Sequence, residues 1–70
     1  MGRPKERRLT DKNLKVLLLV AEGYTDPEIG VELDMTREAV AGHVKTIIDK
    51  LDALNRTNAA VKAIRQGVIE

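Results

Sequence analysis

Cysteine is absent from this 70-residue sequence, and histidine occurs only once, at position 43. No disulfide can therefore form, and no thiolate or histidine cluster is available to hold a zinc ion. The sequence also contains no nucleophile–base pair, no paired carboxylate site and no phosphate-binding glycine loop. We expect a protein without a metal, a cofactor or catalytic residues, and an enzyme is the least favoured class.

Long apolar runs are missing as well. The longest covers residues 16–21, only six positions, and lies between Lys15 and Glu22. A run of this length cannot cross a membrane, and no small-residue cleavage site follows it as in a signal peptide. We therefore expect a cytoplasmic protein with no membrane partner, and a single domain because the chain is short.

An excess of charge of one sign is also lacking, since the net charge is +1. The charges are nevertheless segregated. Residues 1–15 carry six basic and two acidic side chains (+4), residues 22–38 carry one and six (−5), and residues 39–70 carry five and three (+2). Such a distribution is typical of a protein that presents some of its surfaces, but not all, to phosphate.

The patterns that are present predict helices and no strands. A first helix carries apolar side chains at i, i+3, i+4 and i+7, which we expect to be buried: Leu14, Leu17, Leu18 and Ala21. Thr10 can cap its start, and Leu9 with Leu14 suits a hydrophobic staple. Gly23 can supply the left-handed residue that ends the helix.

A second helix begins after Thr25, which forms a Thr-x-x-Glu capping box with Glu28. Pro27 is tolerated in the first turn because the amides there have no partner inside the helix. Gly30 is expected to allow close packing against a neighbouring helix. Asp34 suits the left-handed position of a tight turn.

A third helix opens at Thr36 and has two distinct faces. The apolar positions predict the buried face: Val40, Val44, Ile47 and Leu51. The opposite face is polar or small: Arg37, Glu38, Ala41, Gly42, Lys45, Thr46 and Asp49. Two short helices joined by a tight turn indicate a helix-turn-helix, which places its second helix in the DNA major groove.

A fourth helix is predicted from a cap at Asn55 to an end near Gly67. Ala60 and Ala63 are its expected inward positions. The remaining apolar residues then share an outer face: Val61, Ile64 and Val68. Because an exposed apolar stripe usually has a partner, self-association through this helix is expected.

In this order, the chain resembles the C-terminal DNA-binding domain of LuxR/GerE-type bacterial transcription regulators. The match covers residues 9–69 and rests on these pieces: Leu9-Thr10, Val16-Leu17, Ala21-x-Gly23, Glu28-Ile29, Leu33-x-Met35-Thr36, Val40-x-x-His43, Lys50-Leu51, Asn55-Arg56-Thr57 and Gly67-Val68-Ile69. Region 4 of sigma factors is similar only in the first half. The prediction is thus a basic arm at residues 1–8 and a helix-turn-helix domain at residues 9–70.

The resemblance implies an all-α four-helix bundle that dimerises through its fourth helix and places residues 36–51 in the major groove of double-stranded DNA. Thr36, Arg37 and Arg56 would lie near phosphates, and Lys45 near base edges or the backbone. The predicted DNA-binding set is completed by Ala41, Gly42, Thr46, Lys50, Arg3, Lys5, Arg7 and Arg8. The predicted dimer interface contains Val61, Ile64, Arg65 and Val68.

Some positions depart from the family pattern. Ala41 stands where the family usually has a lysine, and Gly42 removes a second outward side chain, so we expect modest sequence selectivity. Asn13 and Asn58 stand where a capping-box Glu or Gln is common, so we expect two weaker helix starts. Residues 26 and 27 are Asp and Pro at positions that are often polar or basic.

Two functions compete. The first is a small dimeric transcription regulator that consists of the DNA-binding module alone, controlled by its expression level or by a regulatory protein partner. The alternative is a protein-interaction module that keeps the fold but has lost DNA binding, as Ala41, Gly42 and the acidic second helix would permit. His43 is expected to pack and form hydrogen bonds rather than contact phosphate. The basic arm is either a phosphate-seeking or minor-groove segment or a solvated terminus.

Overall fold

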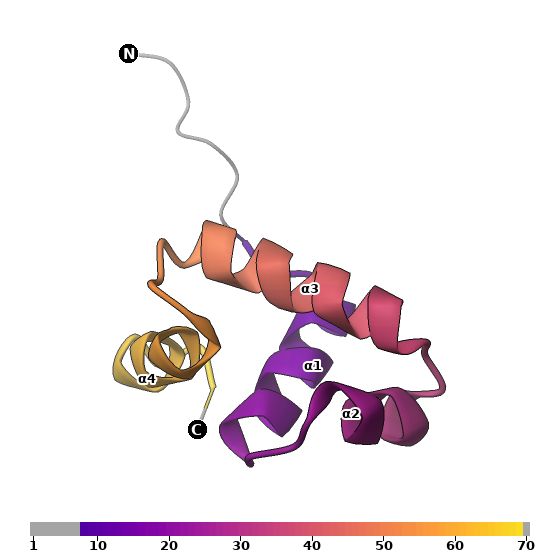
Figure 1. Ribbon diagram of the computed structural model, residues 1–70. Helices are drawn as coiled ribbons and strands as arrows, with labels where there is room; N and C mark the ends of the chain where they lie inside the picture. The colour runs from indigo at the N-terminus through magenta and orange to yellow at the C-terminus, as the bar shows by residue number, and fades with distance from the viewer. Residues whose placement is uncertain (1–7, 70) are drawn as a thin grey trace.

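The computed structural model describes residues 8–69 as four α-helices and no strands, so the predicted all-α fold is confirmed (Figure 1). The helices are α1 (Asp11–Ala21), α2 (Asp26–Leu33), α3 (Arg37–Lys50) and α4 (Arg56–Arg65). None of these helices is long and apolar enough to span a bilayer.

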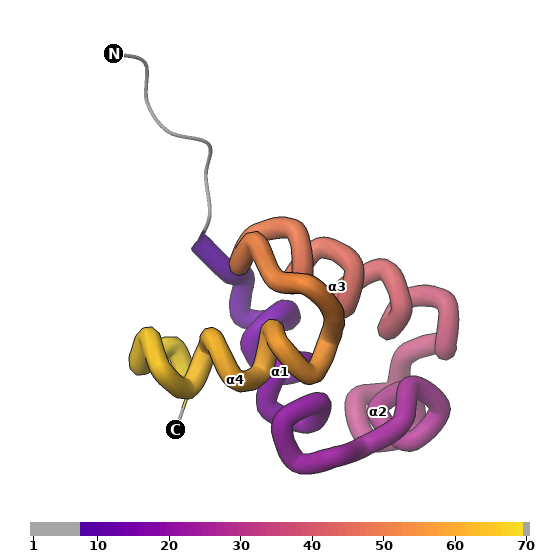
Figure 2. Tube along the Cα trace, turned by 60° about the vertical axis from the view of Figure 1, so that its left-hand side comes forward, coloured from indigo at the N-terminus to yellow at the C-terminus, as the bar shows by residue number. Residues whose placement is uncertain are grey.

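The helices are arranged around a central pair. α1 and α3 each pack against the other three helices. α2 and α4 lie on opposite sides of α1, as the two views in Figures 1 and 2 agree. One long face of α3 is therefore held by the rest of the domain, and the other remains outside it.

All four predicted helix caps are present. Thr10, Thr25, Thr36 and Asn55 each accept a hydrogen bond from the backbone N–H three residues later. The expectation of a weaker start was wrong for α1, where Asn13 completes a capping box with Thr10, whereas α4 has no capping box. The Oδ1 atom of Asn13 accepts the Thr10 N–H at 3.1 Å, and that of Asn58 accepts the Leu54 N–H at 2.9 Å. Asn13 thus satisfies the amide of the cap residue itself, whereas Asn58 bonds the residue before the cap.

The core is apolar and draws on all four helices. The predicted buried face of α3 is confirmed, since Val40, Val44, Ile47 and Leu51 are all buried. In α1, however, the prediction was partly wrong: Val16 and Leu17 are fully buried, whereas Leu18 is 44% exposed and Ala21 lies at the surface. α1 is apolar on several sides, so its contacts with the other helices decide which side is buried.

The turns before and after α2 set how it lies between α1 and α3. Gly23 and Asp34 adopt the predicted left-handed conformation, with φ of 93° and 57°. Gly30 permits a close approach, but to the turn backbone and not, as expected, to another helix. A Cβ at Gly30 would lie 2.6 Å from the carbonyl oxygen of Met35, whose own N–H donates to the Gly30 carbonyl at 2.8 Å.

Candidate nucleic-acid interface

The outer face of α3 has the composition that the sequence predicted. Its side chains are exposed along the whole helix: Arg37, Glu38, Ala41, Gly42, Lys45, Thr46 and Asp49. Within residues 8–69, the side chains of Arg37 and Lys45 take part in no hydrogen bond or ion pair. The outer face of α3 therefore carries two cations, about two turns apart, that are available to an external anion.

The middle of this face is smooth because Gly42 has no side chain. A Cβ built at Gly42 would meet nothing within 4 Å, and the residue sits in ordinary helical conformation. Neither packing nor backbone geometry therefore requires glycine there. The glycine lowers helix stability by about 1 kcal/mol relative to alanine, and in return it lets another molecule approach the α3 backbone closely.

α3 is also fixed by a polar contact with α1. Nδ2 of the buried Asn13 lies 2.9 Å from Nδ1 of the half-buried His43. His43 thus packs and forms a hydrogen bond between helices, in agreement with the packing role expected for it.

Arg56, the first residue of α4, is held by the start of α2 and by the connection that precedes it. Its Nη1 donates to Oδ1 of Asp26 at 2.5 Å, and its Nη2 donates to the Tyr24 carbonyl at 3.3 Å. The backbones of α2 and α4 do not touch, so this ion pair bridges them. Arg56, which was predicted to contact a DNA phosphate, is therefore bound to a carboxylate of its own chain.

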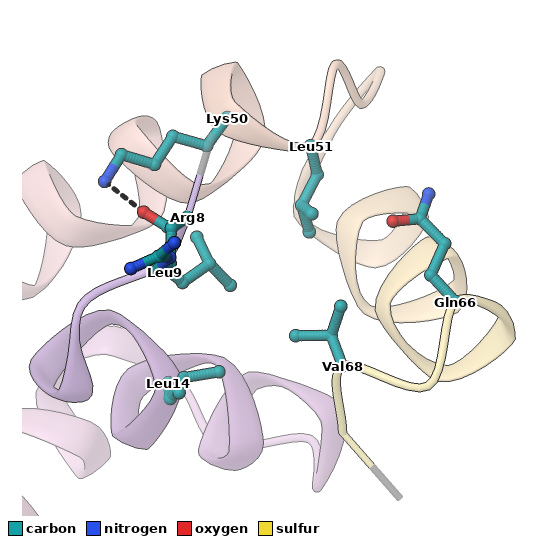
Figure 3. Close-up of a pocket in the computed structure, with 7 residues that line it drawn as sticks. All are labelled: Arg8, Leu9, Leu14, Lys50, Leu51, Gln66 and Val68. Atoms are coloured by element: carbon teal, nitrogen blue, oxygen red, sulfur yellow. Dashed lines mark hydrogen bonds between the residues drawn. The ribbon is translucent and has the colours of Figure 1, made fainter. Parts of the chain in front are cut away.

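Lys50 and the predicted arm meet at the other end of α3. The Lys50 ammonium donates to the Arg8 carbonyl at 2.7 Å (Figure 3). Beside this bond lies a hollow bordered by Leu9, Leu14, Leu51, Gln66 and Val68. Arg3, Lys5 and Arg7 lie outside the described residues.

The outer face of α4 carries two of the three apolar side chains predicted for it. Ala59, Ala60 and Ala63 are buried, whereas Val61, Ile64 and Val68 are 38%, 53% and 38% exposed. We call Val61 and Ile64 the α4 stripe. Val68, assigned to the same face from the sequence, follows the end of α4 and lines the hollow beside Leu14 and Leu51 (Figure 3). Arg65, assigned to the same interface from the sequence, is exposed as well.

Two partners of the site were missed by sequence reasoning. Asn13 and Asp26 each contact a residue 30 positions away, His43 and Arg56 respectively. No local pattern marks such a pair, because it forms only when the helices pack. Among residues 8–69, no group of three histidine, cysteine or acidic side chains could hold a metal ion.

Comparison with known proteins identifies the family. Residues 7–63 match the GerE model, which describes bacterial regulatory proteins of the luxR family. The chain is 46% identical over 61 residues to the transcriptional regulatory protein LiaR of Bacillus subtilis, covering 87% of this chain and 29% of LiaR. It is 36% identical over 62 residues to the response regulator protein VraR of Staphylococcus aureus, covering 89% of this chain and 30% of VraR.

The HTH-type transcriptional regulator AlkS of Ectopseudomonas oleovorans is 39% identical over 61 residues, 87% of this chain and 7% of AlkS. The chain thus spans less than a third of the length of these relatives. The family model covers all of α1, α2 and α3 and most of α4. The chain therefore belongs to the luxR family of bacterial regulatory proteins, whose helix-turn-helix domains serve DNA-binding transcription regulators and are not enzymes.

Proposed function

We propose that this chain binds double-stranded DNA as a homodimer, with α3 in the major groove. The observation that carries the proposal is the outer face of α3, where Arg37 and Lys45 are exposed and have no partner within residues 8–69. A helix whose other face is buried presents such cations at a fixed angle, as a recognition helix requires.

The side chains of α3 divide between positioning and reading. Thr36 and Arg37 lie at its amino end, where the helix dipole and the free amides favour phosphate. Lys45 lies two turns later, where it can reach base edges. Ala41 offers only a methyl contact to thymine, and Gly42 offers close backbone approach. Affinity should therefore be dominated by phosphate contacts, with modest base discrimination.

Dimerisation is assigned to the α4 stripe. Its two apolar side chains are exposed although α4 already buries its alanines against the core. A second copy of the stripe would remove this apolar surface from water and bring two α3 helices to one duplex.

The test is the salt dependence of binding to a 30-base-pair duplex, measured by fluorescence anisotropy from about 50 to about 300 mM salt. Each phosphate neutralised contributes about −0.9 to the slope of log K against log salt. We expect Arg37→Ala to weaken binding and to make this slope shallower. Lys12→Ala, which removes an exposed cation of α1, is the matched control. Absence of binding at the lowest salt would overturn the proposal.

A second candidate function has its own support on α2. Val31 is 85% exposed and lies between the acidic Glu28 and Glu32. An apolar side chain with a carboxylate on either side suits a basic protein partner better than DNA. This protein-interaction role is the function favoured if no DNA binding is found at the lowest salt.

A further inference from the structure

The amino ends of α2 and α4 meet at one ion pair. Asp26 is the first residue of α2 and Arg56 the first of α4, and their side chains are 24% and 35% exposed. The guanidinium is also bonded to the Tyr24 carbonyl in the α1–α2 connection. The pair is thus half-buried and held from two sides, unlike an ion pair between two mobile surface side chains.

The chemistry of this corner suits an anion. A helix amino end attracts negative charge, and a guanidinium binds carboxylate and phosphate in the same forked geometry. At the start of α2, Thr25 already occupies the Glu28 amide and Pro27 has no N–H. The Arg56 guanidinium is therefore the principal anion-binding group of the corner, and the carboxylate of Asp26 occupies it.

The same corner is where a DNA backbone would approach. In a helix-turn-helix the first helix crosses the backbone while the second enters the groove. Here the first helix is α2, and Arg56 reaches its amino end from α4. A phosphate at this point would find its cation already bonded to Asp26.

We propose that Asp26 is an internal competitor for phosphate that sets the DNA affinity of this domain by holding Arg56. The inference rests on the proposed function. On binding, the guanidinium either leaves Asp26 for the phosphate or is shared between two anions that repel each other. Both routes weaken binding relative to a chain without the carboxylate, so Asp26 is an affinity-determining residue that need not touch DNA.

The first test removes the carboxylate. Asp26→Asn should tighten binding to a duplex by about three- to tenfold, and the salt slope should steepen by up to about 0.9 because Arg56 then neutralises one phosphate without an offsetting anion. Glu32→Gln removes the same charge from an exposed position of α2. This control should change affinity by less than about twofold.

The second test is a double-mutant cycle with Arg56. Arg56→Ala should weaken binding only slightly in the native background, because the guanidinium is already held, and strongly in the Asp26→Asn background. Asp26→Ser provides a second carboxylate-free variant, and thermal unfolding identifies the variants that remain folded.

The outcomes separate the two proposals. Failure of the native chain to bind any duplex would overturn the proposed function and, with it, this inference. Native binding that Asp26→Asn weakens, or raises no more than Glu32→Gln does, would overturn the inference alone. An Asp26→Asn gain that persists in the Arg56→Ala background would also overturn it, because the effect would then not pass through Arg56.

Discussion

The amide group of Asn13 bonds the imidazole of His43 at 2.9 Å and thereby ties the start of α1 to the middle of α3. The orientation of this amide is fixed, since its oxygen accepts the Thr10 N–H at 3.1 Å. An amide nitrogen can only donate, so Nδ1 of His43 is the acceptor and the ring proton of the neutral imidazole is on Nε2. One buried side chain thus caps a helix and selects a histidine tautomer.

Removal of the Asn13 side chain should lower the stability of the domain. Asn13→Ala should lower the free energy of unfolding by about 2 kcal/mol, because the Thr10 N–H and the His43 ring both lose a partner. The measurement is urea denaturation followed by circular dichroism. Asn58→Ala is the matched control, since Asn58 accepts only one exposed bond, from Leu54, and should cost about 0.5 kcal/mol. Equal costs for the two variants would contradict a bridging role for Asn13.

Two glycines should respond to alanine in opposite directions. Gly42→Ala should stabilise the domain by about 1 kcal/mol, because a Cβ there meets nothing and the helix gains propensity. Gly30→Ala should destabilise it by about 1–3 kcal/mol, because the Cβ would meet the Met35 carbonyl oxygen at 2.6 Å. Thermal unfolding of both variants checks this, and a stable Gly30→Ala protein would show that the turn yields easily.

Different residues on the outer face of α3 should control DNA affinity and sequence selectivity. Lys45→Ala should flatten the preference among DNA sequences, where one good base contact is worth about 1–3 kcal/mol, whereas Arg37→Ala should weaken every sequence alike. Ala41→Lys should strengthen binding by adding a cation at an exposed position. Selection from a random DNA pool, followed by affinity measurement, checks all three. If Ala41→Lys and Lys45→Ala both leave affinity unchanged, α3 is not the recognition helix.

The α4 stripe should control the oligomeric state. Val61→Asp combined with Ile64→Asp should give a folded monomer that binds a two-half-site duplex more weakly. Val31→Asp is the control, because Val31 is more exposed but lies on α2. Sedimentation equilibrium at about 50 μM distinguishes monomer from dimer. A native chain that sediments as a monomer on its own and on DNA would contradict the assignment.

Interactions between near neighbours could be predicted from the sequence. The caps at Thr10, Thr25, Thr36 and Asn55 were all found because each joins residues three positions apart. The buried face of α3 was found because the apolar residues of this helix are confined to one side. The outer positions of α4 followed once its alanines were placed inward.

Contacts between helices could not be predicted in this way. Residues 16–21 are apolar on every side of α1, so periodicity alone did not exclude Leu18 from the core. The partners of His43 and Arg56 are 30 positions away and depend on how the helices pack. Arg56 was assigned to phosphate from the resemblance alone, and its bond to Asp26 required the structure.

Lys62 fastens α4 to the end of α3, since its ammonium donates to the carbonyl of Asp52 at 2.7 Å and lies 3.5 Å from that of Leu51. Its neighbour Val61 belongs to the α4 stripe. In a dimer joined through this stripe, these bonds would fix the position of each recognition helix relative to the twofold axis. The operator would then have to present its two half-sites at one fixed spacing, and inserting about five base pairs, half a helical turn, would turn the second half-site to the far side of the duplex.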